Sequence, residues 1–504
     1  MGWKNHSKFK KEEVVMRHNY VQYNSPQFRL LSDSQLEELH LATLQILERT
    51  GVAFECQEAI DLLGEAGADV SDPDRVKIPA YMVEQALRTA PKTVTMYSRE
   101  GEVAYVLNGM TGCHFGGAPD PRILQDPYTG ERRTCYVEDI ALNSRLMDAL
   151  PNMEWTYTGA ANNTLPVTPG LDISDRVTLI QYLLNCSKPI VCEITNAEAT
   201  QELIDIATIV AGSEEKLRAK PFFGASCEPV SPLVQGRDAM EKSLIFAGKG
   251  LPIVVYSMPM AGATTPATWP AILTLANAEV LSQLVALQLK NPGAPVIYGS
   301  ITSIMEMRTT IFPYGAPEMS FLVAALTELC HYYKLPMFGT AGCTDAHKLG
   351  VQAGAELVYS LLLTTLSGAD LVHDIGILGN VGSAEVTVLC DELIDMVKVS
   401  MGGIEINEDT LPLDLIEKKG PRSNFISEKH TLKHFRRFWA PTLFDRSVSI
   451  DTYKSAEERI REKTIKIMET HQPKPLADDK VKELHKCEAS LLKRVGLKEY
   501  PKRK

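Results

Sequence analysis

Short apolar runs alternate with longer amphipathic stretches over most of this chain. Eight runs have the length and composition of buried strands, and each of the last six is preceded by helix-compatible sequence. Five of those six begin at a proline, which is tolerated at the first position of a strand but not in its middle. The eight runs are Gly112–Gly116, Glu154–Gly159, Pro189–Ile194, Pro221–Ser226, Pro252–Ser257, Pro295–Gly299, Pro336–Gly339 and Leu371–Asp374.

Strand and helix alternating eight times predict an α/β fold of the (β/α)8 TIM-barrel type rather than a doubly wound sheet. Polar residues follow the last two runs: Gly342-Cys-Thr-Asp345 comes after the seventh, and His373-Asp374 ends the eighth. Because TIM barrels carry their sites where the strands end, we expect the chemistry at this face.

Helical sequence flanks the predicted barrel on both sides. Ser32 and Gln35 form a capping-box pattern, and leucines at helical spacing follow until Gly51. Further helices are predicted at 59–67 and 80–90. We therefore expect an N-terminal helical segment over residues 1–110, the barrel over 111–400, and a C-terminal helical extension and arm over 401–504.

Composition narrows the class of protein. The chain has 504 residues, of which 44% are hydrophobic, so it can bury a large core. Its long apolar stretches, such as Leu357–Leu366, are shorter than the roughly 20 residues that span a bilayer, and the start lacks the apolar segment of a signal peptide. We expect a cytoplasmic protein without a membrane segment. The net charge of −11 argues against nucleic acid as the main partner.

Neither a disulfide framework nor a metal cluster is indicated. The ten cysteines include no Cys-x-x-Cys pair, and His114, His347, His373 and Cys343 show no local ligand spacing, so we predict no metal. Gly376, Gly379 and Gly382 follow the eighth run at intervals of three, a spacing compatible with a phosphate-binding loop. A single glycine pattern of this kind is weak.

Several motifs in this order resemble the trimethylamine methyltransferase family. The resemblance covers about residues 30–445. It rests on residues 31–40 (Leu-Ser-Asp-Ser-Gln-Leu-Glu-Glu-Leu-His), 46–52, 62–68, 90–92, 98–100, 314–318 (Tyr-Gly-Ala-Pro-Glu), 342–345, 352–354, 368–374 (Gly-Ala-Asp-Leu-Val-His-Asp), 431–435 and 439–441.

The resemblance implies a barrel enzyme that moves a methyl group from an amine to the Co(I) of a separate corrinoid protein. The chain itself would bind no cofactor, and a homo-oligomer is expected. Archaeal trimethylamine enzymes of the family carry pyrrolysine, whereas this chain has only standard residues. Members without pyrrolysine resemble quaternary-amine methyltransferases acting on glycine betaine or similar betaines. Such a substrate leaves as a neutral amine, so no catalytic acid or base is expected, only orientation and dispersal of charge.

A quaternary ammonium is attracted to aromatic faces, and a betaine also needs donors for its carboxylate. The predicted substrate-binding residues therefore fall into three groups. Aromatic residues near strand ends or in the loop after strand six come first, then donors for the carboxylate, then acids that offset the cation. They are Tyr157, Tyr256, Tyr298, Phe338, Phe312 and Tyr314; Arg308, His347 and His373; Glu193 and Asp374.

The corrinoid partner has to cover the ends of the strands. Its predicted contacts are the loops at 258–266, 301–315 and 376–383, including Gly376, Gly379 and Gly382. Two alternatives stay open. A phosphate or pterin in the barrel would indicate a methyltetrahydrofolate:corrinoid methyltransferase, and docking without transfer would indicate a non-catalytic scaffold. For His347, the alternative is a place at a helix start near Asp345 as the N-cap.

Overall fold

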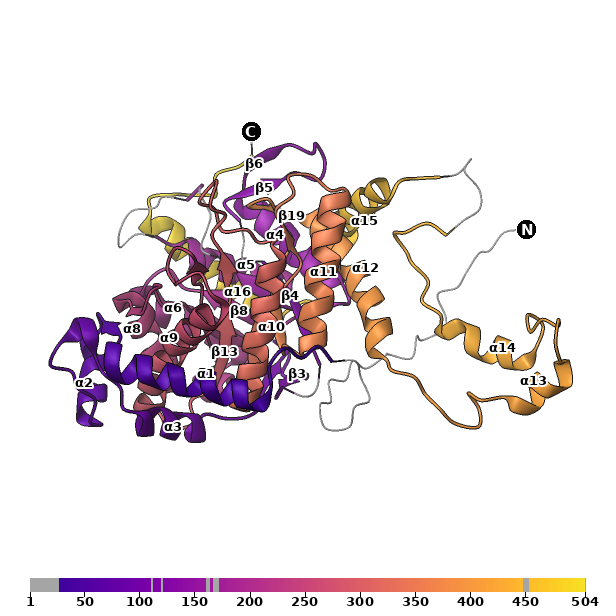
Figure 1. Cartoon of the computed structure of the whole chain (residues 1–504). Helices are drawn as coiled ribbons and strands as arrows, with labels where there is room; N and C mark the ends of the chain where they lie inside the picture. The colour runs from indigo at the N-terminus through magenta and orange to yellow at the C-terminus, as the bar shows by residue number, and fades with distance from the viewer. Residues whose placement is uncertain are drawn as a thin grey trace.

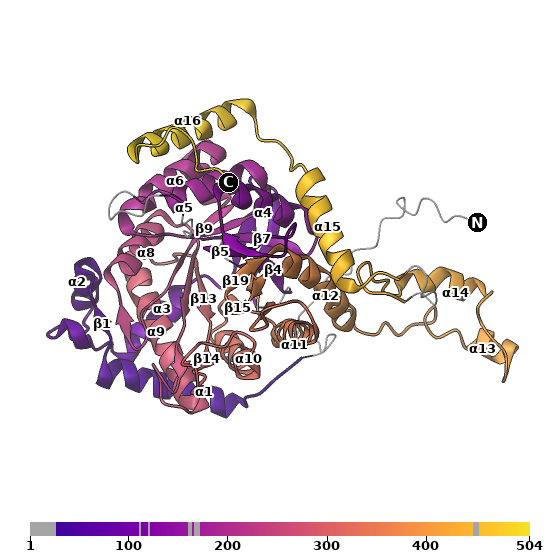
Figure 2. The same ribbon diagram turned by 90° about the horizontal axis from the view of Figure 1, so that it is seen from above.

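A computed structural model of the chain describes residues 27–109, 112–118, 121–159, 164–165, 172–446 and 453–503. Within these residues, eight parallel strands close into a barrel, as Figures 1 and 2 show from the side and from above. The predicted (β/α)8 fold is confirmed, and each predicted run overlaps one strand. In order around the barrel, the strands are β4 (His114–Gly117), β7 (Met153–Thr158), β8 (Ile190–Glu193), β9 (Phe223–Cys227), β11 (Ile253–Ser257), β13 (Val296–Ser300), β15 (Met337–Thr340) and β17 (Leu371–Ile375).

The prolines lie just before the strands and still take part in the sheet. A proline has no N–H to donate, but its carbonyl accepts from the neighbouring strand. Pro252 accepts from the Ala225 N–H at 3.1 Å, and Pro295 accepts from the Ile253 N–H at 2.9 Å. Proline thus marks the start of a strand without leaving a buried donor unpaired.

Helices surround the barrel, in chain order α4 (Val137–Ala149), α5 (Ser174–Asn185), α6 (Ala197–Ala211), α7 (Glu214–Ala219), α8 (Arg237–Lys249), α9 (Trp269–Lys290), α10 (Pro317–Tyr332), α11 (Val351–Ser367) and α12 (Ala384–Met401). In the described part of the chain, α9 alone is long and apolar enough to cross a membrane. It contacts α1 (Asp33–Gln45), α3 (Ala80–Thr89) and α8, and 89% of its most apolar window is buried inside the protein. Its composition is that of a core helix.

The N-terminal helices pack on the outside and one end of the barrel. The predicted capping box is present: the Gln35 N–H donates to Ser32 Oγ at 3.3 Å, and the Ser32 N–H donates to Gln35 Oε1 at 2.9 Å. The π-helical turn η1 (Ile46–Thr50) continues α1, and α2 (Gln57–Glu65) and α3 correspond to the predicted helices. The remaining N-terminal elements are η2 (Pro73–Arg75), a parallel pair of β1 (Ala53–Phe54) with β10 (Val234–Gln235), and an antiparallel pair of β2 (Val94–Tyr97) with β3 (Val103–Leu107).

Asp370 lies at the start of β17, and its carboxylate binds two segments. One is the chain that leads into β4, and the other is the first residue of β15. Its Oδ1 accepts from the N–H groups of Asn108 at 2.8 Å and Gly109 at 2.7 Å, and its Oδ2 accepts from Met337 N at 2.9 Å. Burial raises the pKa of this carboxyl to about 6. A single buried side chain therefore satisfies three backbone donors where the barrel closes.

Above the ends of the barrel strands lies a small five-stranded sheet, called here the roof (Figure 1). Its strands in order are β16 (Cys343–Thr344), β18 (Ile377–Leu378), β19 (Val381–Ser383), β5 (Ile123–Gln125) and β6 (Arg132–Thr134). A shorter pair, β12 (Met260–Ala261) and β14 (Ser303–Ile304), extends two neighbouring barrel strands.

The C-terminal part has two different environments. Helices α15 (Ala456–Thr470) and α16 (Asp478–Arg494) pack on the body, α15 against α4 and α12, and α16 against α5 and α6. In contrast, α13 (Leu413–Lys419), α14 (Lys429–His434) and the 3-10 turn η3 (Phe435–Arg437) project away from the barrel in both views (Figures 1 and 2).

Candidate active site

Aromatic side chains from β7, β11 and β15 meet in the interior of the barrel, below the roof. The Tyr157 and Tyr256 hydroxyls lie 3.3 Å apart, and Tyr157 also bonds Ser226 Oγ at 2.8 Å. The Phe338 ring centroid lies 5.6 Å from that of Tyr256 and 6.2 Å from that of Tyr157. These three predicted residues are buried and form a packed aromatic floor rather than an open cage.

Glycine makes this floor possible. A Cβ on Gly299 would lie 2.7 Å from Tyr256 Cβ and 3.1 Å from Phe338 Cδ1. Both distances are too short for an ordinary carbon contact, so β13 presents bare backbone here and leaves room for the two rings.

His373 belongs to the same floor. Its ring stacks on Phe338 with centroids 4.0 Å apart and planes 17° from parallel, and its Nε2 lies 2.8 Å from Thr340 Oγ1. The other ring nitrogen, Nδ1, is 3.0 Å from Asp374 Oδ1. The structure thus holds His373 as a fixed neighbour of Asp374, at the end of β17 where the sequence predicted a site residue.

Asp374 has an unusual backbone for a non-glycine residue. Its φ is +70°, in the left-handed region, and the pairing of β17 with β4 shifts register between Val372 and Ile375. The residue is buried, and Oδ2 has no hydrogen-bond partner among the described residues. Backbone strain and a buried carboxylate oxygen left open occur together at functional sites more often than elsewhere.

Two further carboxylates lie at the ends of neighbouring strands. Glu193 is the last residue of β8, and Glu228 directly follows β9. Burial raises the pKa of the Glu228 carboxyl to about 7, and the negative charges of Glu193 and Asp374 add to the effect. A hydrogen bond from Tyr256 and the charge of Lys242 act in the opposite direction. Like charges are therefore concentrated above the aromatic floor.

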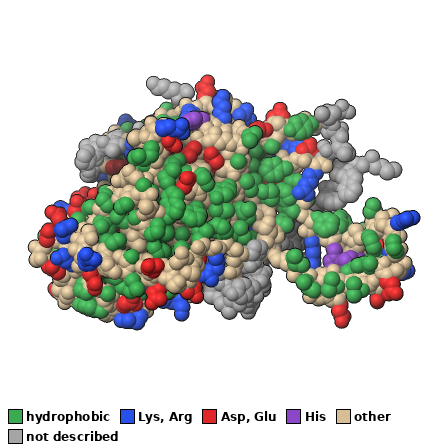
Figure 3. All heavy atoms as spheres, in the orientation of Figure 1, with side chains coloured by type: hydrophobic (Ala, Val, Ile, Leu, Met, Phe, Trp, Pro, Cys, Tyr) green, Lys and Arg blue, Asp and Glu red, His purple; other side chains and the backbone are tan. Residues whose placement is uncertain are grey.

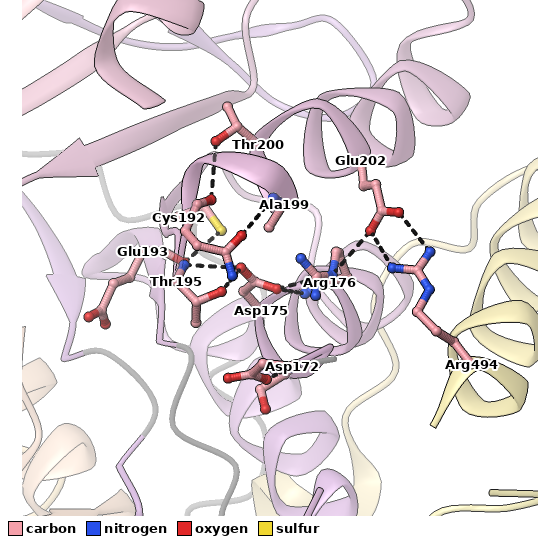
Figure 4. Close-up of polar contacts among 12 residues, drawn as sticks. Asp172, Asp175, Arg176, Cys192, Glu193, Thr195, Ala199, Thr200, Glu202 and Arg494 are labelled. Carbon is pink, nitrogen blue, oxygen red and sulfur yellow. Dashed lines mark hydrogen bonds and ion pairs between the residues drawn. The ribbon is translucent and has the colours of Figure 1, made fainter. Parts of the chain in front are cut away.

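The end of β8 is held by a polar cluster that runs from the buried Asp175 and Arg176 to the surface (Figure 4). Asp175 Oδ2 accepts from the Thr195 N–H at 3.1 Å and from its hydroxyl at 2.8 Å. Arg176 lies 3.3 Å from Asp175 Oδ1, and 3.4 Å from Glu202, which also accepts two hydrogen bonds from Arg494 of α16. The Glu193 carboxylate points away from this cluster in Figure 4. The cluster therefore supports the strand end from which Glu193 projects.

The loop after β13 supplies the next predicted pair, Phe312 and Tyr314. Their rings lie 5.1 Å apart, and both are half-buried. The pKa of the Tyr314 hydroxyl is raised well above its usual range, first by burial and then by the charge of Asp374. Asp345 holds this loop by accepting from the Tyr314 N–H at 2.8 Å and the Gly315 N–H at 2.9 Å. Tyr314 therefore lies near the carboxylates.

Tyr298 does not belong to this site, and its prediction is wrong. Its hydroxyl donates to Asn277 Oδ1 of α9 at 3.1 Å, so the side chain lies between the barrel and its outer helices. Successive residues of a strand face opposite sides, and the next residue, Gly299, is the one beside the floor.

Arg308 and His347 also lie apart from the floor. The Arg308 side chain is exposed and pairs with Glu306 at 3.1 Å. His347 is exposed beside the roof, where Arg132 Nη2 lies 3.2 Å from its Nδ1. The alternative for His347 is not met either, because α11 begins at Val351 after Gly350, and Asp345 caps no helix. These two donors are therefore corrected to surface residues.

The three glycines after β17 are structural residues of the roof. Gly376 and Gly379 are buried, which contradicts their predicted contact with a partner, and Gly382 is packed so closely that a Cβ would lie 2.2 Å from Pro121 Cγ. The N–H groups of Gly376 and Gly379 already donate to the carbonyls of Gly342 and Thr344. They are thus not available to cradle a phosphate.

Glu228 was missed by the sequence prediction. The fourth run was ended at Ser226, whereas β9 continues to Cys227. The signal was present, because a lone carboxylate directly after a barrel strand is typical of a site residue. In the described ranges, no three His, Cys, Asp or Glu side chains converge so that they could hold a metal ion. The predicted absence of a metal stays a prediction.

Fold and site together define a TIM-barrel enzyme whose strand ends present aromatic rings and carboxylates. The chain belongs to the trimethylamine methyltransferase (MTTB) family, whose model matches residues 2–498, and it is a methyltransferase. It is 34% identical to trimethylamine methyltransferase MttB of Desulfitobacterium hafniense strain DSM 10664 / DCB-2, over 89% of this chain and 90% of the relative. It is 31% identical to the glycine betaine methyltransferase of Desulfitobacterium hafniense strain Y51, over 87% and 90%.

Among solved structures, the chain is similar to the monomethylamine methyltransferase MtmB of Methanosarcina barkeri. The TM-score is 0.49 with 11% sequence identity, covering 94% of this chain and 89% of that one.

Proposed function

We propose that this methyltransferase takes a methyl group from a quaternary amine, such as glycine betaine or a similar betaine, and transfers it to the Co(I) of a separate corrinoid protein. The observation that carries the proposal is that Glu228 accepts a hydrogen bond from Tyr256 of the aromatic floor and lies near enough to Glu193 and Asp374 for their charges to act on it. Carboxylates and ring faces both attract a cation, and ring faces suit one that has no N–H to donate.

The reaction that fits this site needs little from the protein beyond binding. The electron pair of Co(I) forms a new bond to the methyl carbon while the N–CH₃ bond breaks. The two electrons of the broken bond stay on nitrogen, which leaves as a neutral tertiary amine. The site has to hold the cation with one methyl group directed toward the corrinoid and exclude water. The corrinoid comes with the partner, which covers the barrel mouth and contacts the loops at 258–266 and 301–315.

The chain matches relatives named for trimethylamine and for glycine betaine over similar lengths. Two other features support a quaternary amine as the substrate. The sequence contains only standard residues, which the family resemblance associates with quaternary amines. The site also presents carboxylates that match a permanent positive charge. Neither open alternative gains support. For the folate enzyme, two of the roof glycines have no free N–H to bind a phosphate. For the scaffold, docking alone would not need carboxylates and aromatic rings inside the barrel.

A demethylation assay with reduced cob(I)alamin tests the proposal. Glycine betaine, choline and trimethylamine are compared at equal concentration, and methylcobalamin formation is followed by absorbance. Choline has the trimethylammonium group of glycine betaine without the carboxylate, so the pair separates recognition of the cation from recognition of the acid.

We expect turnover of glycine betaine and little of trimethylamine. Faster turnover of trimethylamine than of every quaternary amine would refute the proposal. Heat release on titration with a tetrahydrofolate but not with a quaternary amine would favour the folate alternative, and binding of a corrinoid protein without transfer would favour the scaffold.

A further inference from the structure

A long segment leaves the body after α12 and comes back to it 40 residues later. We call residues 402–441 the arm. Its helical elements, α13, α14 and η3, contain no buried residue. Instead the arm exposes large apolar side chains along most of its length: Ile404, Ile406, Leu411, Leu413, Ile416, Phe425, Ile426, Leu432, Phe435 and Phe438. Short helices without a core are marginal in water, so the arm needs another surface to pack on.

Both ends of the arm are fixed on the same helix. The arm begins where α12 ends at Met401, and the returning chain is bound by Glu392, a buried residue of α12. Glu392 Oε1 accepts from the N–H groups of Thr442 at 2.6 Å and Leu443 at 3.0 Å, and Oε2 accepts from the Thr442 hydroxyl at 2.6 Å. The arm is therefore a fixed projection of the body and not a loose tail.

The body has an apolar groove on the side from which the arm projects. The groove has a volume of about 240 Å³ and lies between α11, α12 and α15. In Figure 3, hydrophobic side chains cover this part of the surface over α10, α11 and α12. Its lining includes Leu349, Gly354, Val358, Leu393 and Met396.

Gly354 leaves the groove open. A Cβ at this position would meet no atom within 4 Å in the described part of the chain, so no described neighbour requires glycine there. Glycine in a helix interior is less favourable than alanine by roughly 1 kcal/mol. The absent side chain leaves room for something that enters from outside.

We propose that the occupant of this groove is the arm of a second copy of the chain, so that two copies exchange arms. The arm continues from α12, and Figure 2 shows it on the same side of the molecule as α11, α12 and α15, the helices that line the groove. A twofold axis on this side lets each arm reach the other copy's groove. The arm leaves at the foot of α12, at the end of the barrel opposite the roof (Figure 1). A corrinoid protein bound at the barrel mouth would therefore leave the arm uncovered.

The extent of the apolar surface also fits an exchanged pair. A standard interface buries roughly 800 Å² on each partner. Ten large apolar side chains of the arm are at least a third exposed, and Ile404 and Ile426 are 90% and 81% exposed. Apolar surface of this extent is typical of an interface and not of a monomer.

Sedimentation of the full chain tests the exchange. Gly354→Trp fills the groove without an internal clash, and Gly354→Ala is its matched control; Ile416→Asp places a charge on the arm. We expect wild type and Gly354→Ala to sediment at twice the chain mass, and Gly354→Trp and Ile416→Asp at the chain mass. Thermal unfolding checks that each variant is folded, and Leu413→Asp replaces Ile416→Asp if the latter is not.

Mixing the two monomeric variants is the sharper test. A mixed pair has one intact contact, from the arm of Gly354→Trp to the groove of Ile416→Asp, so a pair should form only in the mixture. In the monomers, trypsin should cut the uncovered arm at Lys418 or Lys419 faster than in wild type. A monomeric wild type would overturn the exchange, and so would a mass that is unaffected by Gly354→Trp. Dissociation by Ile416→Asp alone would show that the arm binds elsewhere.

Discussion

Glu228 gives the most direct test of the charge arrangement at the site. Its pKa is raised to about 7 from an ordinary value of 4.5, so the group is protonated below neutral pH and ionised above it. If the ionised form attracts the cation, the affinity for a quaternary amine should fall as the pH is lowered through 7. If the protonated form binds about 5- to 30-fold more weakly, a pKa of about 7 means that the apparent Kd should increase about three- to eightfold between pH 8 and pH 6.

Replacing Glu228 by Gln removes the charge and keeps the shape. Two unit charges about 5 Å apart interact by about 3 kcal/mol at an effective dielectric constant of about 20. Lys242 offsets part of this attraction, and Glu193 and Asp374 remain, so we expect a smaller loss, about 1–2 kcal/mol at pH 8. This corresponds to a roughly 5- to 30-fold higher Kd, with little pH dependence left between pH 6 and 8.

The same substitution should stabilise the protein without substrate. Because the folded pKa lies above the unfolded one, stability is greatest at low pH and falls as the pH rises through 7. Each pKa unit corresponds to about 1.4 kcal/mol, so ionised Glu228 costs the folded chain on the order of 3 kcal/mol at pH 8. Glu228→Gln should therefore raise the thermal midpoint at pH 8 while weakening binding.

Isothermal titration of glycine betaine or choline from pH 6 to 8 measures the affinity, and calorimetric unfolding measures the stability. Glu214→Gln is a matched control, because Glu214 pairs with Lys249 away from the site and the change in net charge is the same. A flat Kd in wild type over this pH range, or a slope that survives in Glu228→Gln, would refute the role given to Glu228.

Three further predictions concern other parts of the chain. Met307 is 71% exposed in the loop over the barrel mouth and should contact the corrinoid protein. Met307→Asp should therefore slow methyl transfer to that protein but not to free cobalamin. The control Val103→Asp, at the opposite end of the barrel, should alter neither rate. Tyr298→Phe should lower the free energy of unfolding by about 1 kcal/mol through the lost bond to Asn277 and leave the Kd of the substrate unchanged; a weakened Kd would return Tyr298 to the site. Asp370→Ala removes the acceptor of three backbone N–H groups, two of them buried, and should cost more than about 3 kcal/mol in urea unfolding. A loss below about 1 kcal/mol would contradict the role of Asp370 in closing the barrel.

The sequence by itself determined the barrel. Buried parallel strands read as short apolar runs, and prolines and helical stretches separate them, so all eight runs could be located to within two residues at either end. It also placed His373, Asp374 and Glu193 at strand ends, because the last residue of a barrel strand must lie at the face where sites form. Tyr157, Tyr256 and Phe338 followed from the same rule.

Only the tertiary structure decided which side of a strand each side chain occupies and which loops fold over the site. Tyr298 and Gly299 are adjacent, yet one faces the helices and the other the floor, because a shift of one residue reverses the facing of a strand. The fourth run was predicted to end one residue before the true end of β9, so Glu228 was not recognised as a residue at a strand end. Arg308 and His347 lie in loops, whose path depends on contacts with distant segments such as Arg132. The raised pKa of Glu228 comes first from burial, to which the charges of Glu193 and Asp374 at two other strand ends add, and both depend on the packing of distant segments. Local pattern encodes the strands, whereas convergence of their ends depends on packing between residues far apart in sequence.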